Sequence, residues 1–239
     1  MQQEIQKLFK RRIHITMILQ DNILKEYLRN VYFITGTPCG GKTTISQMLA
    51  KKHHFVVYNI DEMFPIHQKM SDVKYQPSMN QNFQNADEFF GRPVEKYWKW
   101  LVDNTREQLD FVLLDLIRLS QNQIVICDCH LTMEDAERLT DAARIVFLLH
   151  DPTHLIDEYC NRLDHLDFYN FIHSSTDVEK AKMTCNETLK LLNTEYYQKI
   201  KSSSYFWLER KEDSTVDATL HSVEQHFHWD ETIIPNSQI

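Results

Sequence analysis

Short apolar runs and longer helical patterns alternate along the chain. Most of the short runs are continuously apolar, which is typical of strands that are buried on both faces. Between the runs, apolar residues recur at helical spacing, for example at Tyr97, Leu101 and Leu109. This order predicts an α/β fold with a five-stranded parallel sheet and helices on both faces. The predicted strands are Val31–Thr35, Phe55–Ile60, Ile124–Cys127, Arg144–Leu149 and Tyr205–Glu209.

Two connections between the predicted strands are much longer than the dozen or so residues that a crossover needs. They span about 61–123 and 150–204, and each begins just after the carboxyl end of a strand, where open α/β sheets bind ligands. We expect the first to form an acceptor cap and the second a lid, within one domain over 31–239. The alternative is that both are helical insertions without a role in binding.

Residues 1–30 are expected to form an N-terminal helical extension that packs on this domain. Its apolar residues lie at near-helical spacing: Met17, Ile18, Leu24 and Leu28.

Composition and charge narrow the class of protein. The formal net charge is −8, which argues against a nucleic-acid partner, because such proteins normally carry a basic field. No apolar run approaches the roughly 18 residues of a membrane span, so no membrane partner is expected. The 5 cysteines are odd in number and irregularly spaced, which favours a reducing compartment over a disulfide framework. The expected location is cytoplasmic, as a monomer or homodimer.

Glycine is concentrated in one loop. The chain has only 4 glycines, and three of them lie between residues 36 and 41, in a match to the phosphate-loop pattern G-x-x-x-x-G-K-[ST]. An apolar strand precedes the loop and an amphipathic helix follows it, as this pattern requires. Phosphate must approach several backbone N–H groups at once, and a Cβ atom would obstruct that approach. The predicted nucleotide-binding residues here are Gly36, Thr37, Pro38, Cys39, Gly40, Gly41, Lys42, Thr43 and Thr44.

With FITGTPCGGKTT at residues 33–44, the chain resembles P-loop kinases of the nucleoside and nucleotide kinase type. It is similar to small-molecule phosphotransferases such as the shikimate, gluconate and chloramphenicol kinases. The resemblance covers the core from about residue 31 to 227, although only the phosphate loop is specific. It implies ATP and Mg²⁺ as cofactors and a small-molecule acceptor for the γ-phosphate.

Phosphoryl transfer needs a lysine on the phosphates, a metal site and a group that takes the acceptor's proton. Lys42 and the Thr43 hydroxyl are predicted to hold the phosphates and Mg²⁺. Asp128 ends the apolar run IVICD and resembles a Walker B carboxylate, a second metal ligand. Asp61 directly follows the second strand, where the resembling kinases place the carboxylate that faces the acceptor hydroxyl. The alternatives are that Asp61 or Asp128 caps a helix, or that Asp128 forms a salt bridge.

Three arginines are candidates for binding charged groups. Arg162 lies where the lid arginines of the resembling kinases lie, and Arg92 could hold the acceptor or its phosphate. Arg210 follows the last strand, near the expected position of an adenine ring. Each could instead be an ordinary surface arginine.

Two other functions stay open beside an ATP-dependent kinase. One is a nucleotide-dependent regulatory ATPase whose caps bind a protein partner, and the other is a nucleotide-binding module without turnover. The guanine signature NKxD is absent, which disfavours a GTPase. We recognise no signature loop or sensor arginine of the kind expected in transport-type or AAA-type ATPases.

Overall fold

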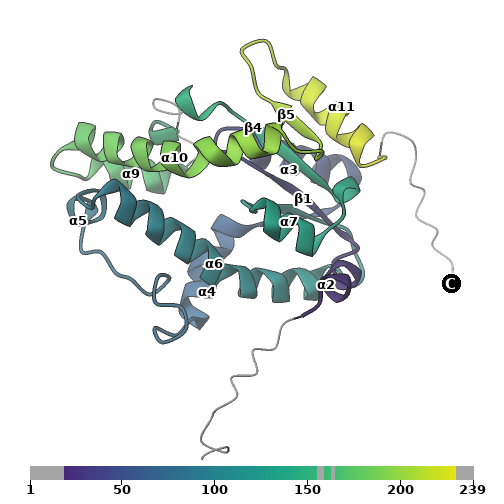
Figure 1. Cartoon of the computed structure of the whole chain (residues 1–239), viewed down its shortest axis with the longest axis horizontal. Coiled ribbons are helices and arrows are strands. Elements are labelled where there is room, and N and C mark those ends of the chain that lie inside the picture. Colours follow the sequence, from purple (N-terminus) through teal and green to yellow (C-terminus); the bar gives the residue numbers. More distant parts are fainter. Residues whose placement is uncertain (1–18, 155–158, 163–164, 230–239) are drawn as a thin grey trace, which may run out of the picture.

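The computed structural model describes residues 19–154, 159–162 and 165–229 of the chain. Its centre is a five-stranded parallel sheet with the order β2-β3-β1-β4-β5, of which Figure 1 labels β1, β4 and β5. The α/β fold expected from the pattern is therefore present. The strands are β1 (Val31–Gly36), β2 (Val56–Asn59), β3 (Val125–Asp128), β4 (Ile145–Leu149) and β5 (Trp207–Glu209).

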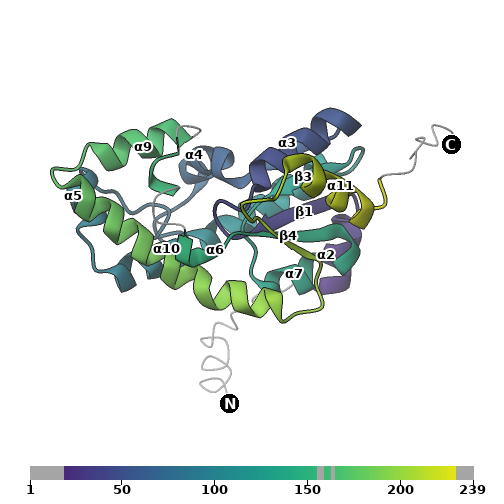
Figure 2. The ribbon, with the colours of Figure 1, turned by 90° about the horizontal axis from the view of Figure 1, so that it is seen from above.

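Helices cover both faces of the sheet, because its strands alternate buried side chains between two hydrophobic clusters. One face packs against α2 (Asp21–Tyr27), α7 (Met133–Leu139) and parts of α6 (Val94–Leu119) and α10 (Val178–Lys201). The other packs against α3 (Lys42–His53) and α11 (Val216–His226). Figure 2 shows the sheet between these two layers.

The two long connections form a helical part at one end of the sheet, on the left in Figure 2. Helices α10 and α6 pack against each other, and the two connections share a hydrophobic cluster that includes Phe89, Tyr97, Cys160 and Leu189. The expected cap and lid are thus packed together rather than separate. The remaining elements are α4 (Ile60–Met70), α5 (Ala86–Phe90), α9 (Leu166–His173) and the 3₁₀ turns Ala142–Arg144 and Pro152–His154.

The predicted strands were correct in existence and order, with small errors at their ends. Ile60 belongs to a helix rather than to β2, because the Asn59 side chain accepts hydrogen bonds from the backbone N–H groups of Asp61 and Glu62. This is an N-cap, and it ends the strand.

The N-terminal extension is described only from residue 19. There α2 packs against α7, and Leu24 and Leu28 are buried in the sheet cluster. Met17 and Ile18 lie outside the described residues. Across the described ranges, no helix combines the length and the apolar character that a membrane crossing requires.

Candidate active site

The phosphate loop connects the central strand β1 to the first turn of α3. Its backbone has positive φ angles at Gly36 (128°), Cys39 (60°) and Gly41 (90°). Helix α3 begins at Lys42, and its N-cap residue, Gly41, has no side chain that could cap the first turn. The N–H groups of this first turn are therefore available to an anion, at the end of the helix that carries partial positive charge.

Two of the loop glycines are required by the protein's own packing. A Cβ atom at Gly36 would lie 2.0 Å from the carbonyl oxygen of Leu148, and one at Gly40 would lie 2.3 Å from it. A Cβ at Gly41 would meet nothing within 4 Å. Our expectation that phosphate alone demands glycine was therefore incomplete, because Gly36 and Gly40 are also needed for close contact with the backbone of β4.

The side chains of Thr37 and Cys39 do not line either cavity described below. The Thr37 hydroxyl donates to the carbonyl of His150 (2.9 Å) and accepts from its backbone N–H (2.6 Å). The carbonyl of Cys39 accepts a hydrogen bond from Nη1 of Arg210 (3.0 Å). These contacts tie the loop to the ends of β4 and β5.

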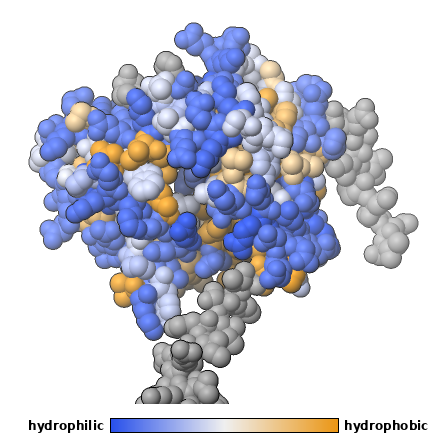
Figure 3. Space-filling view, viewed as in Figure 1, coloured by the Kyte–Doolittle hydropathy of each residue, from blue (hydrophilic) through white to orange (hydrophobic). Residues whose placement is uncertain are grey.

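A cavity of about 200 Å³ brings together most of the predicted catalytic residues. It lies at the carboxyl edge of the sheet, between the phosphate loop and helices α4, α6 and α10. We call it the acceptor-side cavity. The face seen in Figure 3 has a hollow near its middle, between the α6–α10 side and the sheet side. The described residues that line the cavity are Gly36, Pro38, Lys42, Thr43, Ile60, Asp61, Leu101, Thr105, Gln108, Asp128, Cys129, His130, Tyr159, Arg162, His165, Leu189, Leu192 and Asn193.

Asp128 is a buried carboxylate at the end of β3. Its Oδ2 atom has no hydrogen-bond partner among the described residues. Burial raises the pKa of Asp128, and this rise is opposed by the charge of Lys42 and by hydrogen bonding from Thr43. A buried, unsatisfied carboxylate oxygen is costly, so this atom is suited to a bound cation or a bound donor.

Lys42 lies close to two carboxylates, those of Asp128 and Asp61. Its Nζ donates to the carbonyl of Thr37 (2.9 Å). Burial lowers the pKa of Lys42, whereas the charges of Asp128 and Asp61 raise it. The amine is thus held beside the loop by a main-chain contact that a phosphate group could replace.

Asp61 lies in the first turn of α4 and lines the acceptor-side cavity. Its carboxylate is not the cap of this helix, since Asn59 fills that role. The alternative interpretation of Asp61 as a helix cap was therefore wrong. The charge of Asp61 acts on Lys42 and Asp128, which places it in the same electrostatic group.

A second cavity, of about 330 Å³, lies on the other side of the phosphate loop. We call it the nucleotide-side cavity. Its walls come from the loop, from the start of α3 and from the segment between β5 and α11. Arg210 lines it, and its predicted contact with an adenine ring stays a prediction. The described lining residues are Gly40, Gly41, Thr44, Ile45, Leu148, Leu208, Glu209, Arg210, Ser214, Thr215, Val216 and Thr219.

Arg92 lines neither cavity. Its guanidinium lies over four aromatic rings, at 4.2 to 5.0 Å from their centroids, and its Nε donates to the carbonyl of Phe89 (2.8 Å). The rings are those of Phe83, Phe89, Tyr97 and Trp100. The structure does not bring Arg92 to the acceptor side, and its cation–π contacts assign it to packing.

Arg162 does line the acceptor-side cavity, and its charge acts on Asp128. Sequence reasoning assigned no role in the site to several other lining residues, among them Gln108, His130 and Asn193. Burial, together with the nearby charge of Lys42, lowers the pKa of His130 to about 4. His130 was noticeable by its place two residues after Asp128. The two amides carried no signal, because a polar residue in a long helix is usually solvent-exposed.

Two side chains of the site carry oxygen atoms of the kind that bind Mg²⁺. Thr43 and Asp128 supply a hydroxyl and an unsatisfied carboxylate oxygen within one cavity. Within the described ranges no group of three or more His, Cys, Asp or Glu side chains is close enough to hold a metal ion. Mg²⁺ commonly binds through one or two protein oxygens, with phosphates and water completing its shell. The residues present therefore fit a nucleotide-bound Mg²⁺.

A family model described as "AAA domain" matches residues 33–168, which is more than half of the chain. The matched span contains the phosphate loop, Asp61 and Asp128. Among solved structures, a crystal structure described as that of a candidate kinase from Chloroflexus aurantiacus J-10-fl is 15% identical, and the match covers 82% of this chain and 97% of that chain. The TM-score of this match is 0.42. No curated protein sequence matches the chain significantly.

Proposed function

The chain belongs to the AAA domain family, and on this premise we propose that it is an ATP-dependent phosphotransferase. It would move the γ-phosphate of ATP to a small hydroxyl- or phosphate-bearing acceptor. One observation carries the proposal: the phosphate loop lines two cavities, one on each side. The second cavity extends beyond Lys42, Thr43 and Asp128, which nucleotide hydrolysis alone would use, to Asp61 and to helices α6 and α10, and this extension is what an acceptor requires.

The roles of the residues follow from their positions. The nucleotide-side cavity, with Arg210, holds the base and sugar, and the loop N–H groups and Lys42 hold the phosphates. The acceptor enters the opposite cavity, where Asp61 takes the proton from its hydroxyl group. Arg162 neutralises charge that develops on the transferred phosphoryl group. The packed cap and lid exclude water, so that transfer to the acceptor outcompetes hydrolysis.

Thr43 and Asp128 would hold Mg²⁺ together with the nucleotide phosphates. When bound, the ion would neutralise negative charge on the phosphate oxygens.

The test is whether ADP formation depends on an added acceptor. Purified protein is incubated with ATP and Mg²⁺, with and without panels of nucleosides, nucleotides, sugars and aminoglycosides, and ADP is quantified. We expect at least one acceptor to raise ADP formation and to gain a phosphate detectable by mass spectrometry. Lys42→Ala should abolish the signal, whereas Lys51→Ala, an exposed change in the same helix, should retain it.

The second candidate is a nucleotide-dependent regulatory ATPase. The description of the family model favours it, although we recognise no further AAA-type motif in the sequence. It predicts ADP formation that no small acceptor changes. That result, with Lys42-dependent hydrolysis, would favour this second function.

A further inference from the structure

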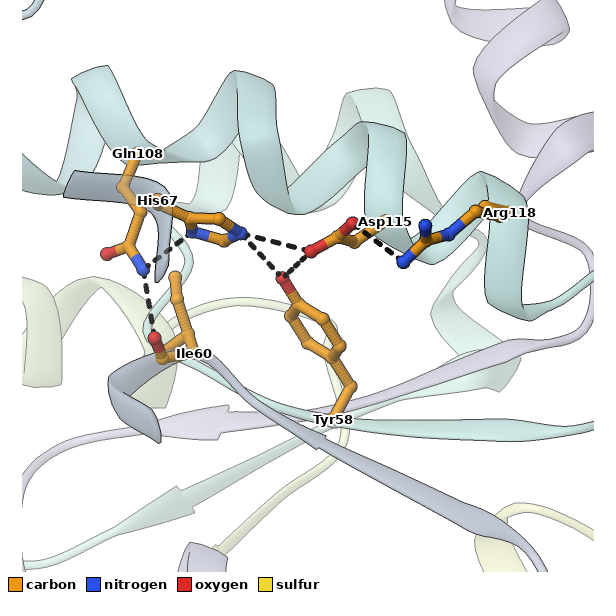
Figure 4. A network of polar contacts seen from close by, with 6 residues as sticks. All are labelled: Tyr58, Ile60, His67, Gln108, Asp115 and Arg118. Carbon is orange, nitrogen blue, oxygen red and sulfur yellow. Dashed lines mark hydrogen bonds and ion pairs between the residues drawn. The ribbon is translucent and has the colours of Figure 1, made fainter. Parts of the chain in front are cut away.

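Gln108 lines the acceptor-side cavity, and its amide nitrogen is already engaged in other contacts. It lies in α6 and is 5% exposed. Its Nε2 donates to the carbonyl of Ile60 (2.9 Å) and contacts Nδ1 of His67 (3.2 Å). These contacts use both amide hydrogens, and Figure 4 shows Oε1 pointing away from both partners. The opposite amide orientation would set two carbonyl oxygens against each other, so Oε1 is the atom left to accept.

Besides its contact with Gln108, His67 is held in place by Asp115. Its Nε2 lies 3.0 Å from Oδ2 of Asp115, so this nitrogen donates and Nδ1 accepts from Gln108 (Figure 4). Tyr58 also donates to the Asp115 carboxylate (3.1 Å). The orientation of Gln108 is therefore fixed from the side remote from the cavity.

Asn193 repeats this arrangement from α10. It is fully buried, and its Nδ2 donates to the carbonyl of Leu189 (2.7 Å). Its Oδ1 has no hydrogen-bond partner among the described residues. Asn193 lines the same cavity as Gln108. A buried, unsatisfied amide oxygen is costly, and a donor on a bound molecule would offset that cost.

The charges of the cavity do not provide for an anionic acceptor. Its described lining contains one lysine and one arginine, Lys42 and Arg162, and also the histidines His130 and His165. The lysine and the arginine both act electrostatically on Asp128, beside the phosphate loop. Asp61 adds a negative charge on the acceptor side, and Arg92, which could have bound an acceptor phosphate, lies elsewhere. The hydroxyl groups of Thr105 and Tyr159 can either donate or accept.

We propose that the acceptor is an uncharged polyhydroxy compound whose O–H groups donate to Asn193 Oδ1, Gln108 Oε1 and Asp61. The proposal rests on the proposed phosphotransferase function and narrows it. At Asn193, Gln108 and Asp61, a phosphorylated or carboxylated acceptor would meet oxygen atoms that accept hydrogen bonds, where its own oxygens need donors. The cavity volume of about 200 Å³ is small for a ligand pocket, which favours a compact molecule.

The first experiment separates charge classes of acceptor. The small-molecule part of yeast extract is passed over an anion-exchange resin, and the unretained and retained fractions are tested for stimulation of ADP formation by the wild-type protein, with Lys42→Ala as the blank. We expect stimulation from the unretained fraction, which should persist after passage over a cation exchanger. Stimulation by the retained fraction alone would overturn this inference while leaving phosphotransfer intact. Stimulation by neither fraction would overturn both.

The second experiment tests the two amides. With the active fraction as the varied substrate, Asn193→Leu and Gln108→Met should each raise the apparent KM for acceptor by about two- to tenfold, the effect of one lost hydrogen bond. The KM for ATP should not change. Thr194→Val, an exposed change next to Asn193 on α10, is the matched control. An unchanged acceptor KM in both amide variants, or an equal rise in the KM for ATP, would contradict the proposal.

Discussion

Replacing Gly40 with alanine adds one methyl group to the phosphate loop. Its carbon atom would lie 2.3 Å from the carbonyl oxygen of Leu148 and 2.8 Å from the carbonyl carbon, whereas real Cβ contacts essentially never fall below 3.0 Å. Because both atoms belong to the backbone of β4, no side-chain rotation relieves the contact and the loop must move. Overpacking of this kind costs about 1–3 kcal/mol. For a chain of this size, that corresponds to a fall in Tm of roughly 2–12 °C.

The assay is thermal unfolding of the nucleotide-free protein. Gly41→Asn serves as the control, because a Cβ there meets nothing within 4 Å and asparagine adopts positive φ more readily than most residues. We expect Gly40→Ala to lower the Tm more than Gly41→Asn does. An unchanged Tm for Gly40→Ala would refute the packing argument and would mean that this glycine serves only the approach of phosphate.

Three further predictions concern single side chains. Asp61→Asn should lower kcat by about 10²–10⁴-fold with little change in ATP affinity, because it removes the proton acceptor; near-normal turnover, or an equal loss in the neighbouring control Glu62→Gln, would exclude Asp61 from the mechanism. Glu224 is buried, which by itself would raise its pKa, but hydrogen bonds and charges from its two basic partners lower the pKa below its ordinary value. Its contribution to stability should therefore be present at pH 7 and decline as the pH falls below about 4.5. In urea unfolding, Glu224→Gln should be about 1 kcal/mol less stable than wild type at pH 7 and closer to wild type at pH 4. A difference in the free energy of unfolding that stays constant between these pH values would contradict this. Arg210→Ala should weaken ATP binding by about two- to tenfold in calorimetry, since it removes a hydrogen bond to the loop and part of the cavity wall, whereas equal binding, or an equal effect of Lys211→Ala, would remove Arg210 from the nucleotide site.

The sheet could be predicted from the sequence because strands buried on both faces leave continuous apolar runs. The positions of Asp61 and Asp128 followed from the same runs, since the carboxyl ends of parallel strands share one edge of the sheet. The end of β2 was misplaced because apolar character continues through Ile60, whereas the boundary depends on the capping side chain of Asn59.

Contacts between segments far apart in the chain could not be predicted from the local pattern of apolar and polar residues. The contact of Gly40 with Leu148 joins segments more than 100 residues apart, so the sequence around the loop does not predict it. Gln108 and Asn193 reach one cavity only because α6 and α10 pack together, and Arg92 lies away from it because four aromatic rings from the cap surround it. Such placements depend on which helices meet, and a single sequence does not encode that in its periodicity.

Every role proposed for the site requires the phosphate loop to bind a nucleoside triphosphate. Isothermal titration of ATP with Mg²⁺ into the nucleotide-free protein tests it most directly. We predict saturable binding of one ATP per chain, lost in Lys42→Ala and retained in Lys51→Ala. Absence of binding to the wild-type protein, or undiminished binding to Lys42→Ala, would contradict the account.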